Sequence, residues 1–125
     1  KCVVVVGSRE DELTAIQELC LEMGMAVQLS ATGTQGLELL EDLDPDLLVM
    51  DLQLPDMHGW EMLGKVKEIT SLRDLPIIVI ADHAAAPDQQ SFALTVAKVE
   101  VYLVKPVSMA KLRQNIWMAL KQRSR

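Results

Sequence analysis

The chain has 125 residues, half of them hydrophobic, which is enough for a single domain to bury its own core. Its formal net charge of -6 excludes a general attraction to nucleic-acid phosphates or to anionic membrane surfaces. No apolar stretch approaches the roughly 18 residues that span a bilayer, and Cys2 and Cys20 lack the spacing of a metal site, so we expect a cytoplasmic domain with buried thiols.

The first part of the chain predicts a strand, a helix and a second strand. Residues 3–6 are four valines without polar alternation, as expected for a strand covered on both faces. Apolar residues then recur at helical spacing, at Leu13, Ile16, Leu19, Cys20 and Met23. Ser8 and Asp11 form a Ser-x-x-Asp pattern, which predicts that Ser8 caps this helix. A weaker strand is predicted at 25–29.

The middle of the chain predicts a helix, a buried strand and another helix. The first helix carries Leu37, Leu40 and Leu43 at helical spacing, and the second carries Met62, Leu63, Val66 and Ile69. The apolar run 47–50 between them ends in Asp51, which is followed by a turn. In an open parallel sheet, ligands bind beyond the carboxyl ends of the strands. Asp51 is therefore the first candidate site residue.

The last part of the chain predicts strands at 77–80 and 101–104, each followed by a helix. A less amphipathic segment with Phe92, Leu94 and Val96 comes first, and a helix striped by Leu112, Ile116 and Leu120, with Ser108 as its cap, comes last. Strand and helix thus alternate five times. Because each parallel connection must cross a sheet face, this alternation predicts a doubly wound, three-layer α/β sandwich with five helices.

The segment Asp51-Leu52-Gln53-Leu54-Pro55-Asp56-Met57-His58-Gly59 resembles the phosphoacceptor segment of response-regulator receiver domains. Lys105-Pro106, at the end of the last predicted strand, resembles the lysine-proline pair of that family, whose peptide bond is often cis. Tyr102 falls at the position of the switch aromatic of the family. The resemblance covers essentially the whole chain, and it implies a flavodoxin-like sheet with strand order 2-1-3-4-5.

This resemblance implies a signalling role in which a phosphoryl group passes from a histidine kinase or a phosphotransfer protein to Asp51. In the family, Lys105 would pair with a phosphoryl oxygen, and Mg²⁺ would be held by Asp51, by the backbone of Gln53 and by an acidic pair after the first strand. A hydroxyl after the fourth strand would report the modification to Tyr102. No enzymatic activity is implied beyond self-phosphorylation from a phosphodonor.

Two parts of the family pattern are absent from this chain. Gly7 and Ser8 replace the acidic pair, and Ala81 stands at the hydroxyl position. We therefore expect weak Mg²⁺ binding and inefficient phosphorylation. The alternative is a pseudo-receiver, in which the same fold serves as an interaction or dimerisation module that does not depend on phosphorylation.

Other acidic residues offer limited replacement for the lost ligands. Glu10 and Asp11 are expected in the first turn of a helix, and Asp82 is expected to face solvent, with a metal site or a pair with Lys105 as alternatives. Asp51 and Lys105 could also form a purely structural pair, and Tyr102 could be a strand aromatic with a surface hydroxyl. His58 is expected to be a solvated loop residue.

Enzyme classes with related folds fit the sequence less well. A nucleotide-binding loop after the first strand would need more glycine than Gly7 alone, and the acids that follow it would repel a phosphate. Hydrolases that use two strand-end aspartates are disfavoured because Gln53 stands two residues beyond Asp51.

The last two strand-helix elements are the surface that receivers use for dimerisation and for contact with output domains. Trp117 and Met118 lie off the apolar stripe of the last helix, so they either expose apolar surface or lie along the helix flank. The start at Lys1 and the basic end at 121–125 suggest that residues 1–125 form one domain of a longer protein, next to an output or kinase domain.

Overall fold

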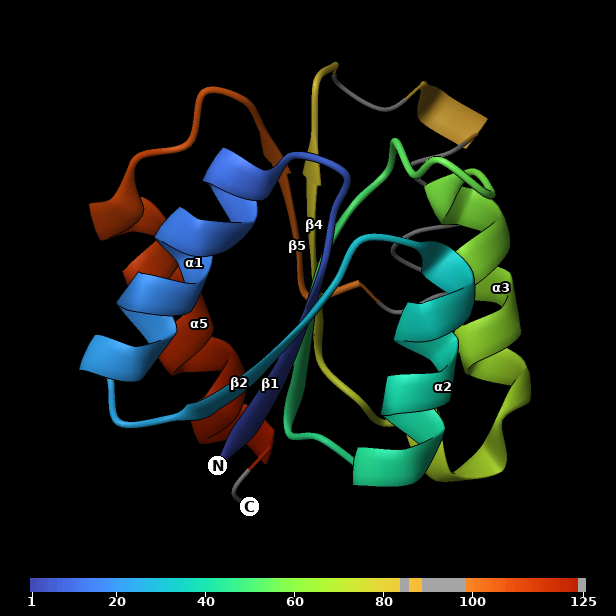
Figure 1. Ribbon diagram of the computed structural model, residues 1–125, viewed down its shortest axis with the longest axis horizontal. Coiled ribbons are helices and arrows are strands. Elements are labelled where there is room, and N and C mark those ends of the chain that lie inside the picture. The colour runs from blue at the N-terminus through green and yellow to red at the C-terminus, as the bar shows by residue number, and fades with distance from the viewer. Residues whose placement is uncertain (84–85, 89–98, 124–125) are drawn as a thin grey trace.

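A computed structural model describes residues 1–83, 86–88 and 99–123. A five-stranded parallel sheet forms the centre of the molecule, with helices on both faces (Figure 1). The strands are β1 (Cys2–Val6), β2 (Ala26–Ser30), β3 (Leu47–Asp51), β4 (Ile77–Ala81) and β5 (Val101–Val104). The helices are α1 (Glu10–Glu22), α2 (Gly33–Leu43), α3 (Gly59–Glu68), the short 3-10 helix η1 (Thr70–Leu72) and α5 (Met109–Arg123).

The strand order is β2-β1-β3-β4-β5, and every pairing is parallel. This confirms the predicted doubly wound sheet, with each predicted strand within one residue of its position. In Figure 1, α1 and α5 cover one face of the sheet and α2 and α3 cover the other. The fifth predicted helix, with Phe92, Leu94 and Val96, falls within 89–98 and lies outside the described residues.

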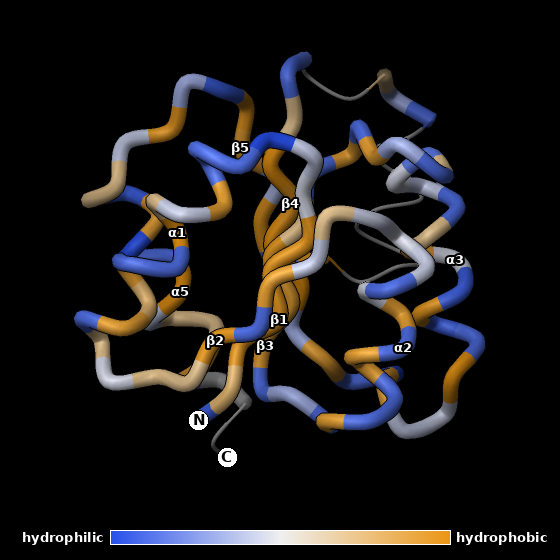
Figure 2. The backbone as a smooth tube through the Cα atoms, viewed as in Figure 1, coloured by the Kyte–Doolittle hydropathy of each residue, from blue (hydrophilic) through white to orange (hydrophobic). Residues whose placement is uncertain are grey.

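Two apolar clusters fill the space between the sheet and its helices, and the strands are their most hydrophobic part (Figure 2). Because side chains alternate along a strand, every strand except the edge strand β2 contributes to both clusters. In β3, Leu48 and Met50 pack on the α2/α3 side, and Leu47 and Val49 pack on the α1/α5 side. Every residue of β3 and of β4 is buried, as expected for central strands of a parallel sheet.

This alternation decides on which face of the sheet the candidate residues lie. Asp51 follows Val49 by two positions, and Lys105 follows Leu103, another residue of the α1/α5 cluster, by two positions. Both charged residues are therefore directed to the α1/α5 side. Tyr102, one residue before Leu103, packs on the opposite side.

The predicted helix caps are only partly confirmed. Ser8 does not cap α1: the cap position is Arg9, whose side chain makes no capping bond, and the helix begins one residue later than the Ser-x-x-Asp pattern requires. The start of α1 is stabilised in another way. Three acidic residues occupy its first turn, at 10–12, and their negative charges interact favourably with the positive end of the helix dipole. Ser108 caps α5 as predicted, because its hydroxyl accepts a hydrogen bond from the Lys111 amide at 3.1 Å.

Two predictions of burial need correction, and His58 has a role that was not predicted. Leu43 is 41% exposed, because the buried side of α2 is formed by Gly33, Gly36 and Leu40. Cys20 is buried, but Cys2, the first residue of β1, is only partly buried. Burial raises the pKa of the Cys20 thiol to about 11. His58 is exposed in its loop as predicted, yet its Nδ1 also accepts a hydrogen bond from the Trp60 amide and so caps α3.

Across the described ranges, no helix is long and apolar enough to cross a membrane.

Candidate functional site

Asp51 and Lys105 meet at the carboxyl edge of the sheet, as the sequence predicted. Asp51 is the last residue of β3, and Lys105 follows the last residue of β5. The Lys105 ammonium donates a hydrogen bond to Asp51 Oδ2 at 2.6 Å, and the Gln53 amide donates to Asp51 Oδ1 at 3.0 Å. The Asp51 side chain is only 10% exposed. Each carboxylate oxygen therefore has a donor, and the Lys105-Pro106 peptide bond is cis.

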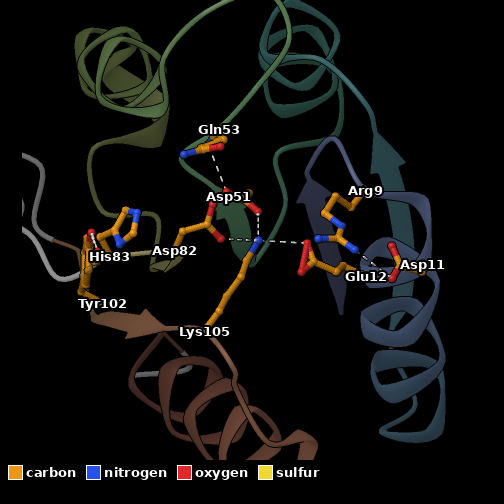
Figure 3. A network of polar contacts seen from close by, with 9 residues as sticks. All are labelled: Arg9, Asp11, Glu12, Asp51, Gln53, Asp82, His83, Tyr102 and Lys105. Atoms are coloured by element: carbon orange, nitrogen blue, oxygen red, sulfur yellow. Dashed lines mark hydrogen bonds and ion pairs between the residues drawn. The ribbon is translucent and has the colours of Figure 1, made fainter.

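Two further carboxylates contact the same ammonium group (Figure 3). Lys105 Nζ lies 3.0 Å from Glu12 Oε1 and 3.3 Å from Asp82 Oδ1. Asp82 is exposed, as expected, and it also pairs with Lys105, which was one of the alternatives. Glu10 and Asp11 lie in the first turn of α1 as predicted, and Asp11 pairs with Arg9 at the surface.

Sequence reasoning missed Glu12. A signal for it exists, since Glu12 lies one helical turn before Ile16 and so continues the apolar stripe of α1 at its amino-terminal end. A carboxylate on the buried side of a helix, at the end nearest the strand termini, points to the edge where Asp51 lies. That signal could have been read from the sequence.

The charges around Lys105 fix its protonation state. Partial burial on its own would lower the pKa of the ammonium, but the hydrogen bonds and the charges of Asp51 and Glu12 outweigh burial and raise it. Lys105 therefore stays positively charged throughout the physiological range. Its single positive charge faces three carboxylates.

The residues present do not fit a divalent cation well. Gly7 and Ser8 supply no carboxylate at the end of β1. Among residues 1–83, 86–88 and 99–123, no group of three His, Cys, Asp or Glu side chains is arranged to hold a metal ion. Mg²⁺ requires close oxygen ligands at about 2.0–2.1 Å, and the nearby carboxylates are bound to an ammonium instead.

The residues expected to form the switch are close together but not coupled through a hydroxyl. Ala81 is buried at the end of β4 on the same side of the sheet as Tyr102. The Tyr102 hydroxyl donates to the His83 carbonyl oxygen at 2.8 Å, and its ring stacks on Trp60 with centroids 6.1 Å apart. Partial burial raises the pKa of Tyr102. The contact with Trp60, from the first turn of α3, was not predicted.

A cavity of about 600 Å³ opens beside Asp51, between α1, α5 and the sheet. Its polar mouth contains the four charged residues of the site, which are Glu12, Asp51, Asp82 and Lys105. Arg9 and Asp11 also line the cavity, and most of the remaining lining is apolar. Asp51 is therefore reached from this side of the sheet.

The loop that follows Asp51 is tied to α2 by Asp56. The Asp56 carboxylate accepts hydrogen bonds from the Thr34 hydroxyl at 2.6 Å, the Thr34 amide at 2.9 Å and the Gly33 amide at 2.8 Å. These bonds lower the pKa of the Asp56 carboxyl from 3.8 to about 2. The bond from the Thr34 hydroxyl has the largest effect, and the two amide bonds add to it. These bonds connect the loop to the amino-terminal end of the helix, where a negative charge is favoured.

We expect Asp56→Asn to destabilise the protein at neutral pH. Since the folded-state pKa is depressed, the stabilisation by Asp56 is complete above the usual carboxyl pKa and is lost as the pH falls from about 4 towards about 2. Urea unfolding of wild type and variant at a series of pH values measures this effect. The difference between their midpoints should shrink over that interval, whereas Asp42→Asn, at an exposed position of α2, should leave the wild-type profile unchanged.

Comparison with known proteins agrees with this geometry. Residues 3–117 match the model of the response regulator receiver domain family. The polar-differentiation response regulator DivK of Brucella ovis is 28% identical over 116 residues, which is 93% of each chain. A CheY-like receiver domain protein from Methanospirillum hungatei has a TM-score of 0.90 and 26% identity, covering 99% of this chain and 96% of that one.

One neighbour was solved with its metal. The receiver domain of the Pseudomonas aeruginosa sensor histidine kinase PA1611, with a magnesium ion coordinated in its active-site cleft, has the same fold, with a TM-score of 0.85, 24% identity, and coverage of 97% of this chain and 98% of that one. The family match, the strand order and the Asp51-Lys105 pair lead to one conclusion. This chain belongs to the response-regulator receiver domain family.

Proposed function

We propose that this receiver domain accepts a phosphoryl group on Asp51 from a phosphohistidine of a histidine kinase or a phosphotransfer protein, at a low rate. The observation that carries the proposal is the 2.6 Å contact between Asp51 and Lys105 at the carboxyl edge of the sheet, beside an open cavity. It joins a nucleophile to a cation at the place where α/β sheets bind ligands.

The chemistry uses this chain's own groups in a simple way. A carboxylate oxygen of Asp51 attacks the phosphorus atom, the phosphorus-nitrogen bond breaks, and the imidazole leaves with its electron pair and takes up a proton from solvent. The product is an acyl phosphate on Asp51. The Lys105 ammonium neutralises a phosphoryl oxygen during transfer and pairs with it afterwards.

The low rate follows from the surrounding charges. An incoming phosphoryl group meets Glu12 and Asp82 as well as Asp51, and among the described residues Lys105 is the cation that pairs with all three. Two like charges about 4 Å apart repel by roughly 4 kcal/mol at an effective dielectric constant of 20. Solvent reduces this repulsion for Glu12 and Asp82, which are 33% and 41% exposed, but does not reverse its sign.

The test is direct modification of the intact domain. We expect incubation with a small phosphodonor to add one phosphoryl group slowly, seen by intact mass, and we expect Asp51→Asn to abolish the addition. Asp42→Asn removes an exposed carboxylate of α2, which covers the other face of the sheet, and it should be modified like wild type. Modification that persists in Asp51→Asn, or its absence from folded wild type at high donor concentration, would contradict the proposal.

A second candidate is a pseudo-receiver that acts through protein contacts without phosphate. It is favoured by the three carboxylates that already surround Lys105, and by Ala81, which has no hydroxyl to couple a phosphoryl group to Tyr102. In that case the domain works through its surfaces. On α5, Trp117 is 57% exposed and Met118 is 48% exposed, with the Lys121 ammonium 4.9 Å from the Trp117 ring.

These exposed side chains offer a surface for a homodimer or for a neighbouring output or kinase domain. Sedimentation of wild type and of Trp117→Glu, with and without phosphodonor, separates the two candidates. Self-association that is lost in the variant and is unchanged by the donor supports the pseudo-receiver. Association that appears only after modification of Asp51 supports the phosphoacceptor.

A further inference from the structure

The three carboxylates around Lys105 come from separate parts of the fold. Glu12 belongs to α1, Asp51 ends β3, and Asp82 follows β4. Their oxygens lie 3.0, 2.6 and 3.3 Å from Lys105 Nζ. Figure 3 shows the three side chains converging on the ammonium from different sides.

The Lys105 ammonium donates hydrogen bonds to Glu12 and Asp51 and forms an ion pair with Asp82. The Lys105 side chain is only 20% exposed, so solvent screens the group little. Lys105 is thus the common partner that holds α1 and the ends of two central strands to the end of β5.

A divalent ion bound to Asp51 would compete with this arrangement. It would need oxygen ligands at about 2.0–2.6 Å, and the carboxylates that could supply them already surround the Lys105 ammonium. The positive charge of that ammonium would repel the ion at short range. Gly7 and Ser8 offer no charged ligand to offset the repulsion.

We infer that Lys105 is the resident cation of this site: its ammonium, held by Glu12, Asp51 and Asp82, takes the place of a divalent metal ion. Glu12 and Asp82 are positioning residues that keep the ammonium central. The inference goes beyond the proposed function and does not depend on phosphoryl transfer, since it concerns only which cation neutralises the three carboxylates.

The test measures metal binding without a phosphodonor, so its outcome is separate from that of the modification experiment. Wild type is titrated with Mn²⁺, read by the loss of the free-ion electron paramagnetic resonance signal, and with Mg²⁺ in competition. We expect no saturable binding to wild type at millimolar concentrations. If wild type binds one ion and Asp51→Asn does not, the inference is overturned, and no lysine variant is needed to reach that result.

Lys105→Met provides the positive test, because it removes the charge and keeps an unbranched apolar side chain. Three carboxylates would then face one another without a cation, and their oxygens would have to move by about 0.5–1.3 Å to reach ligand distances of about 2.0–2.1 Å. We expect this variant to bind Mn²⁺ roughly tenfold or more tightly than wild type and to gain thermal stability when Mn²⁺ is added. The double variant Lys105→Met, Glu12→Gln should lose most of this increase in Mn²⁺ affinity.

Lys65→Met is the matched control, since Lys65 pairs with a single exposed carboxylate, Glu61, at 3.5 Å. It should gain no metal affinity. If Lys105→Met folds only when Mn²⁺ is present, the inference is supported as well. A folded Lys105→Met whose Mn²⁺ affinity equals that of Lys65→Met would overturn it.

Discussion

Replacing both Gly7 and Ser8 by aspartate is expected to raise the affinity for Mg²⁺ by roughly tenfold to a hundredfold and to speed the modification of Asp51. The two new carboxylates would lie at the end of β1, next to the end of β3, to which β1 is paired. They would add hard oxygen ligands and negative charge, so that the ion is favoured despite Lys105.

The structure has room for this change. An ideal Cβ atom at Gly7 would lie 3.3 Å from Leu13 Cδ2 and 3.8 Å from Asp51 Cβ, so only the end of a flexible leucine has to move by a few tenths of an ångström. Ser8 is exposed. The double variant should therefore fold, with a small loss of stability.

Calorimetric titration with Mg²⁺ and the modification rate measure the outcome. The control is the double variant Gly64→Asp, Ser71→Asp, which adds the same charge on α3 and η1, away from the site. A Cβ atom at Gly64 meets open space, and Ser71 is exposed, so both positions can accept an aspartate. If the Gly7, Ser8 variant is folded and binds Mg²⁺ no better than this control, the lost acidic pair does not belong at these positions.

Gly59→Ala is expected to destabilise the domain by about 2–3 kcal/mol. Gly59 begins α3, and a Cβ atom there would lie 2.6 Å from the Leu52 Cα atom, which is backbone and cannot move aside alone. The Gly59 amide also donates to the Leu52 carbonyl at 2.8 Å, so the two segments are held in contact. Because Leu52 directly follows Asp51, a shift there should also slow modification of Asp51.

Gly64→Ala is the matched control within the same helix. An ideal Cβ atom at Gly64 meets no atom within 4 Å, and alanine favours a helix over glycine by about 1 kcal/mol. We therefore expect Gly64→Ala to raise the urea midpoint and Gly59→Ala to lower it. Equal urea midpoints for the two variants would contradict the prediction, because they would mean that the backbone at Leu52 moves away from the new Cβ atom at little cost in stability.

Local signals made most of the fold predictable. The valine and isoleucine runs mark strands covered on both faces, because only a sheet between two helix layers buries such runs completely. The helix start at Glu10 was misplaced by one residue, since a Ser-x-x-Asp pattern competes with other ways to satisfy the first turn. Leu43 belongs to the apolar stripe of α2 by its helical spacing but is exposed. The helical period indicates which side of α2 faces inward, and it does not indicate where the helix extends beyond the core.

The sequence by itself determined that Asp51 and Lys105 lie at the carboxyl ends of strands in one parallel sheet, and it offered their direct pairing as one alternative. Both follow strand residues of one face by two positions, and parallel strands end at the same edge, so alternation and topology are enough to bring them together. The absence of the family's acidic pair and hydroxyl at Gly7, Ser8 and Ala81 was equally plain, since it is a matter of residue identity.

Only the tertiary structure decided the surroundings of this pair. The approach of Glu12 and Asp82 to the ammonium, and the stacking of Tyr102 on Trp60, join elements that lie far apart in the chain. Such contacts depend on how each helix and loop packs against the sheet, to within about an ångström, and a side-chain pattern along the sequence does not specify that distance. Whether Lys105 has one carboxylate partner or three is therefore a property of the packed structure.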